Sequence, residues 1–254
     1  FHGQISFLKA GLFYADHITT VSPTYSKEIT QPENSYGMYG LLQNCEIEGH
    51  LTGILNGVDE TIWNPETDPL INKNYKIRSI KSKLVNKTSL QHHFGLPENA
   101  DALLMVMVSR LTQQKGVDYL LTSLSEKLRQ YPNLQFILLG NGAPEYEHAF
   151  NQLQQQFPEQ VGIFIGYNEN LAHAIIAGGD IILIPSRFEP CGLTQLYGLK
   201  YGTLPLARKT GGLADTVEPD KTGFLFNQSN TDELNQAIDE AITLWRQPKK
   251  FDRY

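Results

Sequence analysis

Five apolar runs are separated along the chain by segments in which apolar residues recur with helical spacing. The runs occupy residues 102–108, 136–139, 161–165, 181–184 and 204–207. Strands buried on both faces of a parallel sheet have continuous apolar runs of this kind, whereas a strand with one wet face alternates. We therefore predict that these runs are strands of a parallel sheet.

The segments between the runs have the pattern of amphipathic helices. After the first run, apolar residues recur at i, i+3, i+4, i+7 and i+11, at Val117, Leu120, Leu121, Leu124 and Leu128. Residues 150–157 and 234–245 repeat the pattern, and Asn230 or Thr231 is the expected N-cap of the later helix. Alternating strands and helices predict an α/β fold with helices on both faces of the sheet.

The first fifty residues do not share this alternation. Leu8–Tyr14 is predicted as a helix, His17–Val21 as a short strand, and Pro23–Ile29 as a helix with proline at its start. Residues 31–50 are polar and rich in glycine and tyrosine, which predicts an exposed loop. Residues 64–76, which follow, are mostly turn-forming and include few apolar residues.

These differences divide the chain into three parts. We predict that residues 1–52 are the end of one Rossmann-like domain and that residues 53–80 are a hinge or connector. Residues 81–254 form most of a second Rossmann-like domain. Because the first residue is Phe1, we expect the sequence to be a fragment.

Composition narrows the function classes. The net charge of −6, with dispersed Lys and Arg, argues against nucleic-acid binding, which needs a basic face. No apolar run reaches the ~18 residues of a membrane span, and the first residues lack the pattern expected of a signal peptide. The two cysteines, Cys45 and Cys191, indicate reduced thiols in a cytoplasmic protein. No residues have metal-ligand spacing, so we expect no metal cofactor.

Two cations follow the first predicted strand, in Ser109-Arg110-Leu111-Thr112-Gln113-Gln114-Lys115-Gly116. Ligands of parallel sheets bind beyond the carboxyl ends of the strands. Arg110 offers a planar fork for phosphate oxygens and Lys115 a point charge, so an anion site is one interpretation. Two solvated charges in a loop are the alternative.

Glycines close the next predicted strand, in Leu139-Gly140-Asn141-Gly142. Gly140 there predicts a tight turn and a close approach of the backbone to a ligand. The G-x-G-x-x-G fingerprint of dinucleotide sites is absent because Glu145 holds its third position. A plain turn is the alternative interpretation.

A carboxylate follows the strand 181–184, in Phe188-Glu189-Pro190-Cys191-Gly192-Leu193-Thr194-Gln195. We predict a helix starting after Gly192 and including Leu196 and Leu199. Its free N–H groups would favour an anion, and Glu189 suits sugar hydroxyls. An acidic helix start with no ligand is the alternative.

Taken together, several segments resemble the glycogen/starch synthase family in family order. They are residues 15–25, 55–59, 109–116, 185–198 and 209–216. The resemblance implies the GT-B architecture, in which two Rossmann-like domains face each other across a cleft. It also implies retaining transfer of glucose from ADP-glucose to the end of an α-1,4-glucan. These residues lack the family's N-terminal Lys-x-Gly-Gly loop and its N-terminal histidine. The resemblance therefore implies that the chain alone is inactive.

The resemblance assigns roles to individual residues. Arg110 and Lys115 would hold the donor diphosphate and stabilise the leaving nucleotide, and Glu189 would accept hydrogen bonds from glucose hydroxyls; these three are the expected catalytic residues. The expected donor-binding residues are Asn56, Gly140, Tyr167, Cys191, Gly192, Leu193 and Thr194. Among them, Tyr167 would stack on adenine and Asn56 would face the cleft.

Two other functions stay open at this point. Another GT-B nucleotide-sugar transferase would share most of these segments, although Tyr197 stands where many such enzymes carry a second glutamate. A non-catalytic nucleotide- or glucan-binding module is the alternative from another class, against which the intact Arg110, Lys115 and Glu189 argue. Dinucleotide oxidoreduction is disfavoured by the missing glycine fingerprint.

Overall fold

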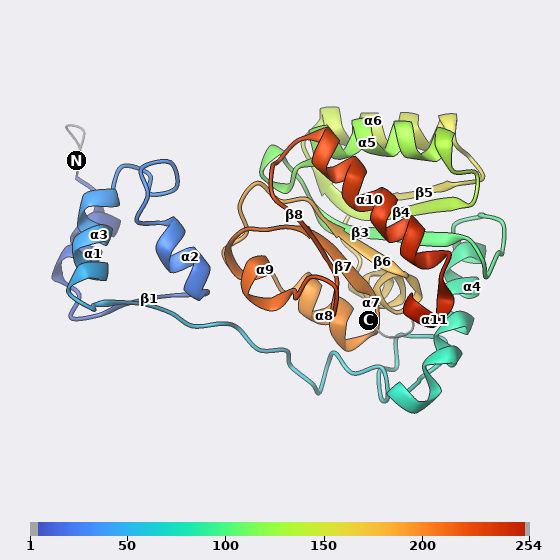
Figure 1. Ribbon diagram of the computed structural model, residues 1–254, viewed down its shortest axis with the longest axis horizontal. Coiled ribbons are helices and arrows are strands. Elements are labelled where there is room, and N and C mark those ends of the chain that lie inside the picture. The colour runs from blue at the N-terminus through green and yellow to red at the C-terminus, as the bar shows by residue number, and fades with distance from the viewer. Residues whose placement is uncertain (1–4, 252–254) are drawn as a thin grey trace.

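The structure is a computed structural model and describes residues 5–251. Its first part, which we call the small unit (residues 5–53), contains three helices beside a pair of parallel strands (Figure 1). These elements are α1 (Phe7–Tyr14), β1 (Ile18–Thr20), α2 (Pro23–Glu28), α3 (Tyr39–Ile47) and β2 (Leu51–Gly53). The predicted first helix, short strand and proline-started helix are confirmed.

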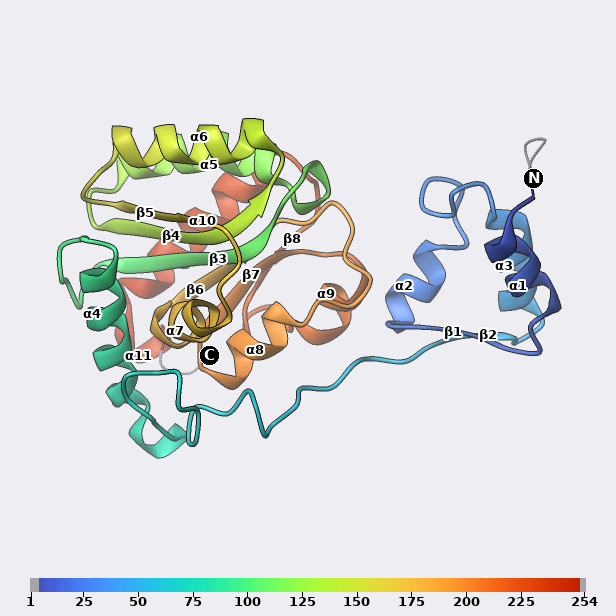
Figure 2. The same ribbon diagram turned by 180° about the vertical axis from the view of Figure 1, so that it is seen from behind.

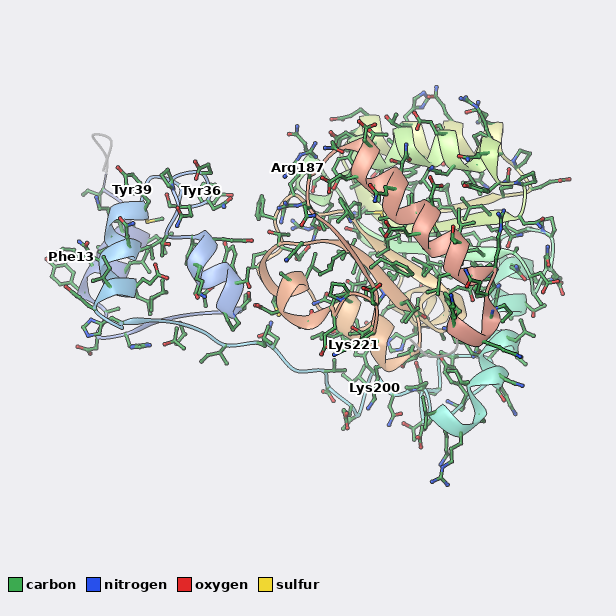
Figure 3. All side chains as sticks on the ribbon, in the orientation of Figure 1. Phe13, Tyr36, Tyr39, Arg187, Lys200 and Lys221 are labelled. Atoms are coloured by element: carbon green, nitrogen blue, oxygen red, sulfur yellow. The ribbon has the colours of Figure 1, made fainter. Side chains whose placement is uncertain are left out.

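The predicted loop over residues 31–50 is wrong, because α3 forms there. Leu42 is the one buried side chain of α3, so the helix lacks the apolar stripe that makes an amphipathic helix visible in a sequence. Aromatic side chains of the small unit, among them Phe13, Tyr36 and Tyr39, point away from its centre (Figure 3).

A connector, residues 54–76, leaves the small unit without helix or strand and leads to the 3-10 helix η1 (Ile77–Ser82). Trp63 anchors the connector, because its ring stacks on His173 at 3.7 Å and on Tyr197 at 3.9 Å between ring centroids. The buried Asp68 accepts hydrogen bonds from His173 Nδ1 at 2.7 Å and from the Tyr201 hydroxyl at 2.6 Å. The connector is therefore packed onto the larger unit along its second half.

The larger part, which we call the sheet unit (residues 83–251), is built on six parallel strands. They are β3 (Leu103–Leu111), β4 (Leu134–Gly142), β5 (Val161–Ile165), β6 (Ile181–Ile184), β7 (Leu204–Arg208) and β8 (Phe224–Phe226). Their order across the sheet is β5-β4-β3-β6-β7-β8. The chain therefore builds outward from β3 in one direction and then from β6 in the other, which makes the boundary between these strands a topological switch point.

Helices cover both faces of this sheet, as Figure 2 shows from behind. They are α4 (Lys83–His93), α5 (Val117–Gln130), α6 (Pro144–Gln156), α7 (Glu169–Gly178), α8 (Thr194–Lys200), α9 (Gly211–Thr216), α10 (Thr231–Trp245) and α11 (Pro248–Phe251), with the 3-10 turn η2 (Gln113–Lys115). Along β3 the side chains alternate between two cores. Leu103 and Met105 pack with α5, α6 and α10, whereas Leu104 and Val106 pack with α4 and α7.

All five predicted strands are confirmed, as are the predicted α/β fold and the Asn230 cap, whose side chain accepts from the Glu233 N–H. Strand β8 was not predicted, because a run of three apolar residues is too short to stand out. The turn expected at residues 139–142 comes directly after Gly142, since β4 extends through Gly142 and α6 begins at Pro144. Gly140 continues β4 opposite Ser109, where a Cβ would lie 2.2 Å from the Ser109 carbonyl oxygen.

Buried cations join α4 to the end of α7 and to the residues just before β6 and β7. Lys83 is buried, and its ammonium group donates to the Ala177 carbonyl and to Thr203 Oγ1, each at 2.7 Å. Lys87 forms an ion pair with Asp180 at 2.7 Å, and both side chains are nearly inaccessible to solvent. Burial lowers the pKa of Lys83 to about 7, an effect that Asp180 opposes and Lys87 reinforces.

The Lys83 pKa makes stability depend on pH. In the unfolded chain this amine stays protonated up to ~10.4, so between pH 7 and pH 10 the unfolded state binds more protons and stability rises with pH. Relative to Lys83→Met, we expect the wild-type free energy of unfolding to gain about 2–4 kcal/mol over this range. Urea unfolding at both pH values measures it. The exposed Lys81→Met is the control, and parallel pH curves for wild type and Lys83→Met would contradict the expectation.

Candidate functional site

A cavity of about 350 Å³ opens where β3 and β6 end, at the switch point of the sheet. Both strands contribute their carboxyl ends, followed by η2 from the β3 side and by the loop before α8 from the β6 side. The cavity is lined by Met107, Val108, Ser109, Arg110, Lys115, Leu183, Ile184, Pro185, Ser186, Glu189, Gly192, Leu193, Thr194 and Gln195. Its volume is in the range of small-molecule sites.

An ion pair crosses this cavity. Lys115 Nζ lies 2.5 Å from Glu189 Oε2, and the Ser186 hydroxyl donates to the same oxygen at 2.9 Å. The Glu189 and Lys115 side chains are only 10 % and 17 % exposed. A partly buried carboxylate with two donors is held in one orientation, so Glu189 is a fixed acceptor for a ligand.

Arg110 supplies a second cation on the same wall. It is exposed at the end of β3, and no ion-pair partner for it exists within residues 5–251. Two cations face one carboxylate, so the cavity has a net positive charge before any ligand enters. The arrangement suits an anion with several oxygens, such as a diphosphate.

The loop before α8 forms the opposite wall. Gly192 takes the left-handed conformation with φ +70°, and a Cβ there would meet Gln195 Oε1 at 2.4 Å. The Gln195 amide donates to the Cys191 carbonyl at 2.9 Å and to the Gly192 carbonyl at 3.0 Å. Because Tyr197 is the first residue whose N–H bonds back along the helix, to Leu193, the preceding amides are available for an anion.

Six of the ten predicted site residues meet in this cavity: Arg110, Lys115, Glu189, Gly192, Leu193 and Thr194. The other four lie outside its lining. Cys191 is buried within the loop, Gly140 is inside β4, Tyr167 is 83 % exposed, and Asn56 is exposed in the connector. Their predicted roles in donor binding stay predictions.

Sequence reasoning missed two side chains that shape the site. Ser186 orients Glu189, and the fully buried Gln195 holds the loop 191–192. A buried glutamine resembles an ordinary helix residue in a sequence, so no local signal identified it. Within residues 5–251, no cluster of three or more His, Cys, Asp or Glu is placed to hold a metal, and no helix is long and apolar enough to cross a membrane.

Two protein families match parts of this chain. The family described as "Glycosyl transferases group 1" matches residues 89–254, and the "Starch synthase catalytic domain" matches residues 1–44. The chain belongs to the glycosyl transferases group 1 family. The switch-point cavity and both of its cations lie inside the matched region.

Curated relatives of this chain carry the name glycogen synthase. The protein from Actinobacillus pleuropneumoniae serotype 5b is 54 % identical over 98 % of the chain and 54 % of its own length. That from Mannheimia succiniciproducens is 55 % identical over 99 % of the chain and 54 % of its own length. The chain therefore spans about half the length of these relatives.

Solved structures confirm the predicted GT-B fold. The catalytic domain of starch synthase IV from Arabidopsis thaliana, bound to ADP and acarbose, is 34 % identical, with a TM-score of 0.89 over 97 % of this chain and 52 % of that one. Sucrose-phosphate synthase from Thermosynechococcus elongatus, at 21 % identity, shares the fold with a TM-score of 0.65 over 97 % of this chain and 54 % of that one.

The Lys115–Glu189 ion pair affects how tightly the cavity binds an anion, and this effect can be tested. In Glu189→Gln the carboxylate that competes for Lys115 is gone, so we expect inorganic pyrophosphate to bind about 3–10 times more tightly. In Lys115→Met we expect it to bind at least about ten times more weakly.

Calorimetric titration with pyrophosphate measures both variants. Glu159→Gln, which removes an exposed carboxylate near the other end of the sheet, is the matched control and should bind as the wild type does. Weaker binding in Glu189→Gln would show that the carboxylate does not compete for Lys115.

Proposed function

We propose that the protein containing this chain is a glycogen synthase, which transfers glucose from ADP-glucose to the non-reducing end of an α-1,4-glucan with retention of configuration. The observation that carries the proposal is the cavity at the β3–β6 switch point. It joins Arg110, Lys115 and Glu189 in a chain that is 54–55 % identical to curated glycogen synthases. The nucleotide is inferred from the starch synthase structure, which holds ADP.

In this proposal the cavity binds the donor. Arg110 and Lys115 bind the diphosphate, and the amides around Gly192–Thr194 approach it from the opposite wall. Glu189 accepts hydrogen bonds from the hydroxyl groups of the glucose. Tyr167, exposed after β5, would stack on the adenine, and Asn56, exposed in the connector, would face the cleft between the two domains.

The chemical step exchanges one glycosidic bond for another. The bond between glucose C1 and the diphosphate oxygen breaks while the terminal glucan hydroxyl bonds to C1 on the same face. The hydroxyl proton passes to the departing phosphate. Arg110 and Lys115 stabilise the charge that develops on that phosphate, which is electrostatic catalysis and uses no metal in this proposal.

Two other functions fit the chain less well than glycogen synthesis does. Another nucleotide-sugar transferase would share the cavity, but 54–55 % identity over nearly the whole chain favours the glycogen synthases. A non-catalytic module would not need a carboxylate held at the cavity by both Lys115 and Ser186. Glycogen and its nucleotide-sugar donor are substrates of the cytoplasm, so we propose that location.

Nucleotide selectivity tests the donor assignment. We expect ADP and ADP-glucose to bind more tightly than UDP, and Arg110→Ala to weaken ADP binding by about 10–100-fold, because one charge-assisted contact to the diphosphate is lost. Isothermal titration of the chain and the variant measures this. A preference for UDP would point to another nucleotide-sugar transferase.

An activity measurement tests whether residues 1–254 are sufficient for glucosyl transfer. We expect residues 1–254 alone to bind ADP but to elongate glycogen at less than about one thousandth of the full-length rate, because one wall of the cleft is missing. Incorporation of labelled glucose from ADP-glucose, compared with the full-length protein, measures it. Elongation by the chain near the full-length rate would contradict the expectation.

A further inference from the structure

Where α2 packs on α9, each of the two units contributes one carboxylate that contacts the other unit. Asp215, from α9, accepts from the Ser22 hydroxyl at 2.6 Å and from both the N–H and the hydroxyl of Thr24, at 3.0 and 2.6 Å. These donors form the start of α2, so a side chain of the sheet unit satisfies the first turn of a helix in the small unit.

Glu28 makes the reciprocal contact. It lies at the end of α2, and its Oε1 accepts from the Thr210 hydroxyl and from the Gly211 N–H, each at 2.9 Å. Thr210 is buried and is the N-cap residue of α9. Each unit therefore supplies the carboxylate that satisfies the first turn of a helix in the other.

The start of α9 is in turn packed directly against the backbone of Glu189. The Gly212 N–H donates to the Glu189 carbonyl at 3.2 Å and to the Pro190 carbonyl at 3.1 Å. A Cβ on Gly211 would lie 2.0 Å from the Glu189 carbonyl oxygen, so no space separates the two segments. A shift of the Gly211–Gly212 backbone must therefore move the backbone that carries the Glu189 carboxylate.

We propose that Glu28 and Asp215 are positioning residues that act on Glu189 through the first turn of α9. When the two units are in contact, Glu28 fixes Thr210 and Gly211, and Gly212 fixes the Glu189 backbone. Asp215 holds α2 against the same helix from the other end. The inference rests on the proposed function, because it assigns the consequence of this contact to glucosyl transfer.

The route predicts which step depends on these carboxylates. Arg110 and Lys115 lie on the β3 side of the cavity, and no hydrogen bond or ion pair joins them to α9 in the described part of the chain. Glu28 therefore reaches these cations only indirectly, through Glu189, and we expect the affinity for the nucleotide to change less than the rate does. The orientation of Glu189 toward the sugar depends on Glu28, so we expect the loss of Glu28 to lower mainly kcat.

The test uses the full-length protein with Glu28→Ala and Asp215→Ala. We expect each to lower kcat about tenfold, the equivalent of one charge-assisted hydrogen bond, with the Kd for ADP within about twofold of wild type. Glu28→Gln keeps an oxygen acceptor for Thr210 and Gly211, so it should recover most of the rate. Glu33→Ala, an exposed glutamate of the same unit, is the matched control.

Amide hydrogen exchange gives a readout that does not depend on activity. We expect faster exchange at Gly211 and Gly212 in Glu28→Ala but not in Glu33→Ala. Unchanged exchange, an unchanged kcat, or equal losses in kcat and ADP affinity would each overturn the positioning role. If the wild type transfers no glucose while exchange responds to Glu28, the proposed function fails and the coupling remains.

Discussion

The ion pair between Lys115 and Glu189 is the interaction on which the candidate site depends. It joins two segments that follow different strands, η2 after β3 and the loop after β6, across the switch point of the sheet. Without a partner each charge would be poorly solvated, since both side chains are largely covered. The pair also leaves Arg110 as the excess cation, so one contact decides both the shape and the charge of the cavity.

Other long-range contacts join the connector and the small unit to the elements around this site. Trp63 inserts between His173 and Tyr197 and thereby ties the connector to α7 and α8. Tyr197 lies on the helix that starts beside the cavity, and its ring stacks on Trp63. The exchanged carboxylates Glu28 and Asp215 join the small unit to the helix that supports the Glu189 backbone.

Local pattern predicted the elements that bury much apolar surface. Strands β5 and β6 have the predicted bounds, and α10 begins after the predicted cap, because continuous runs and helical spacing are direct consequences of burial on a sheet. The pattern failed where burial is slight. Helix α3 buries only Leu42, β8 has three residues, and Gly140 is required by the close approach of Ser109 rather than by a turn.

By itself the sequence determined the α/β class, five of the six strands of the sheet and the residue types at their carboxyl ends, because these depend on periodicity and local chemistry. Only the tertiary structure decided which of them meet. Strand order places Lys115 beside Glu189, 74 residues away, and Glu28 beside Gly211, 183 residues away. Periodicity carries no information about such pairings. They arise on folding, when distant segments pack together and most buried polar groups form hydrogen bonds with one another.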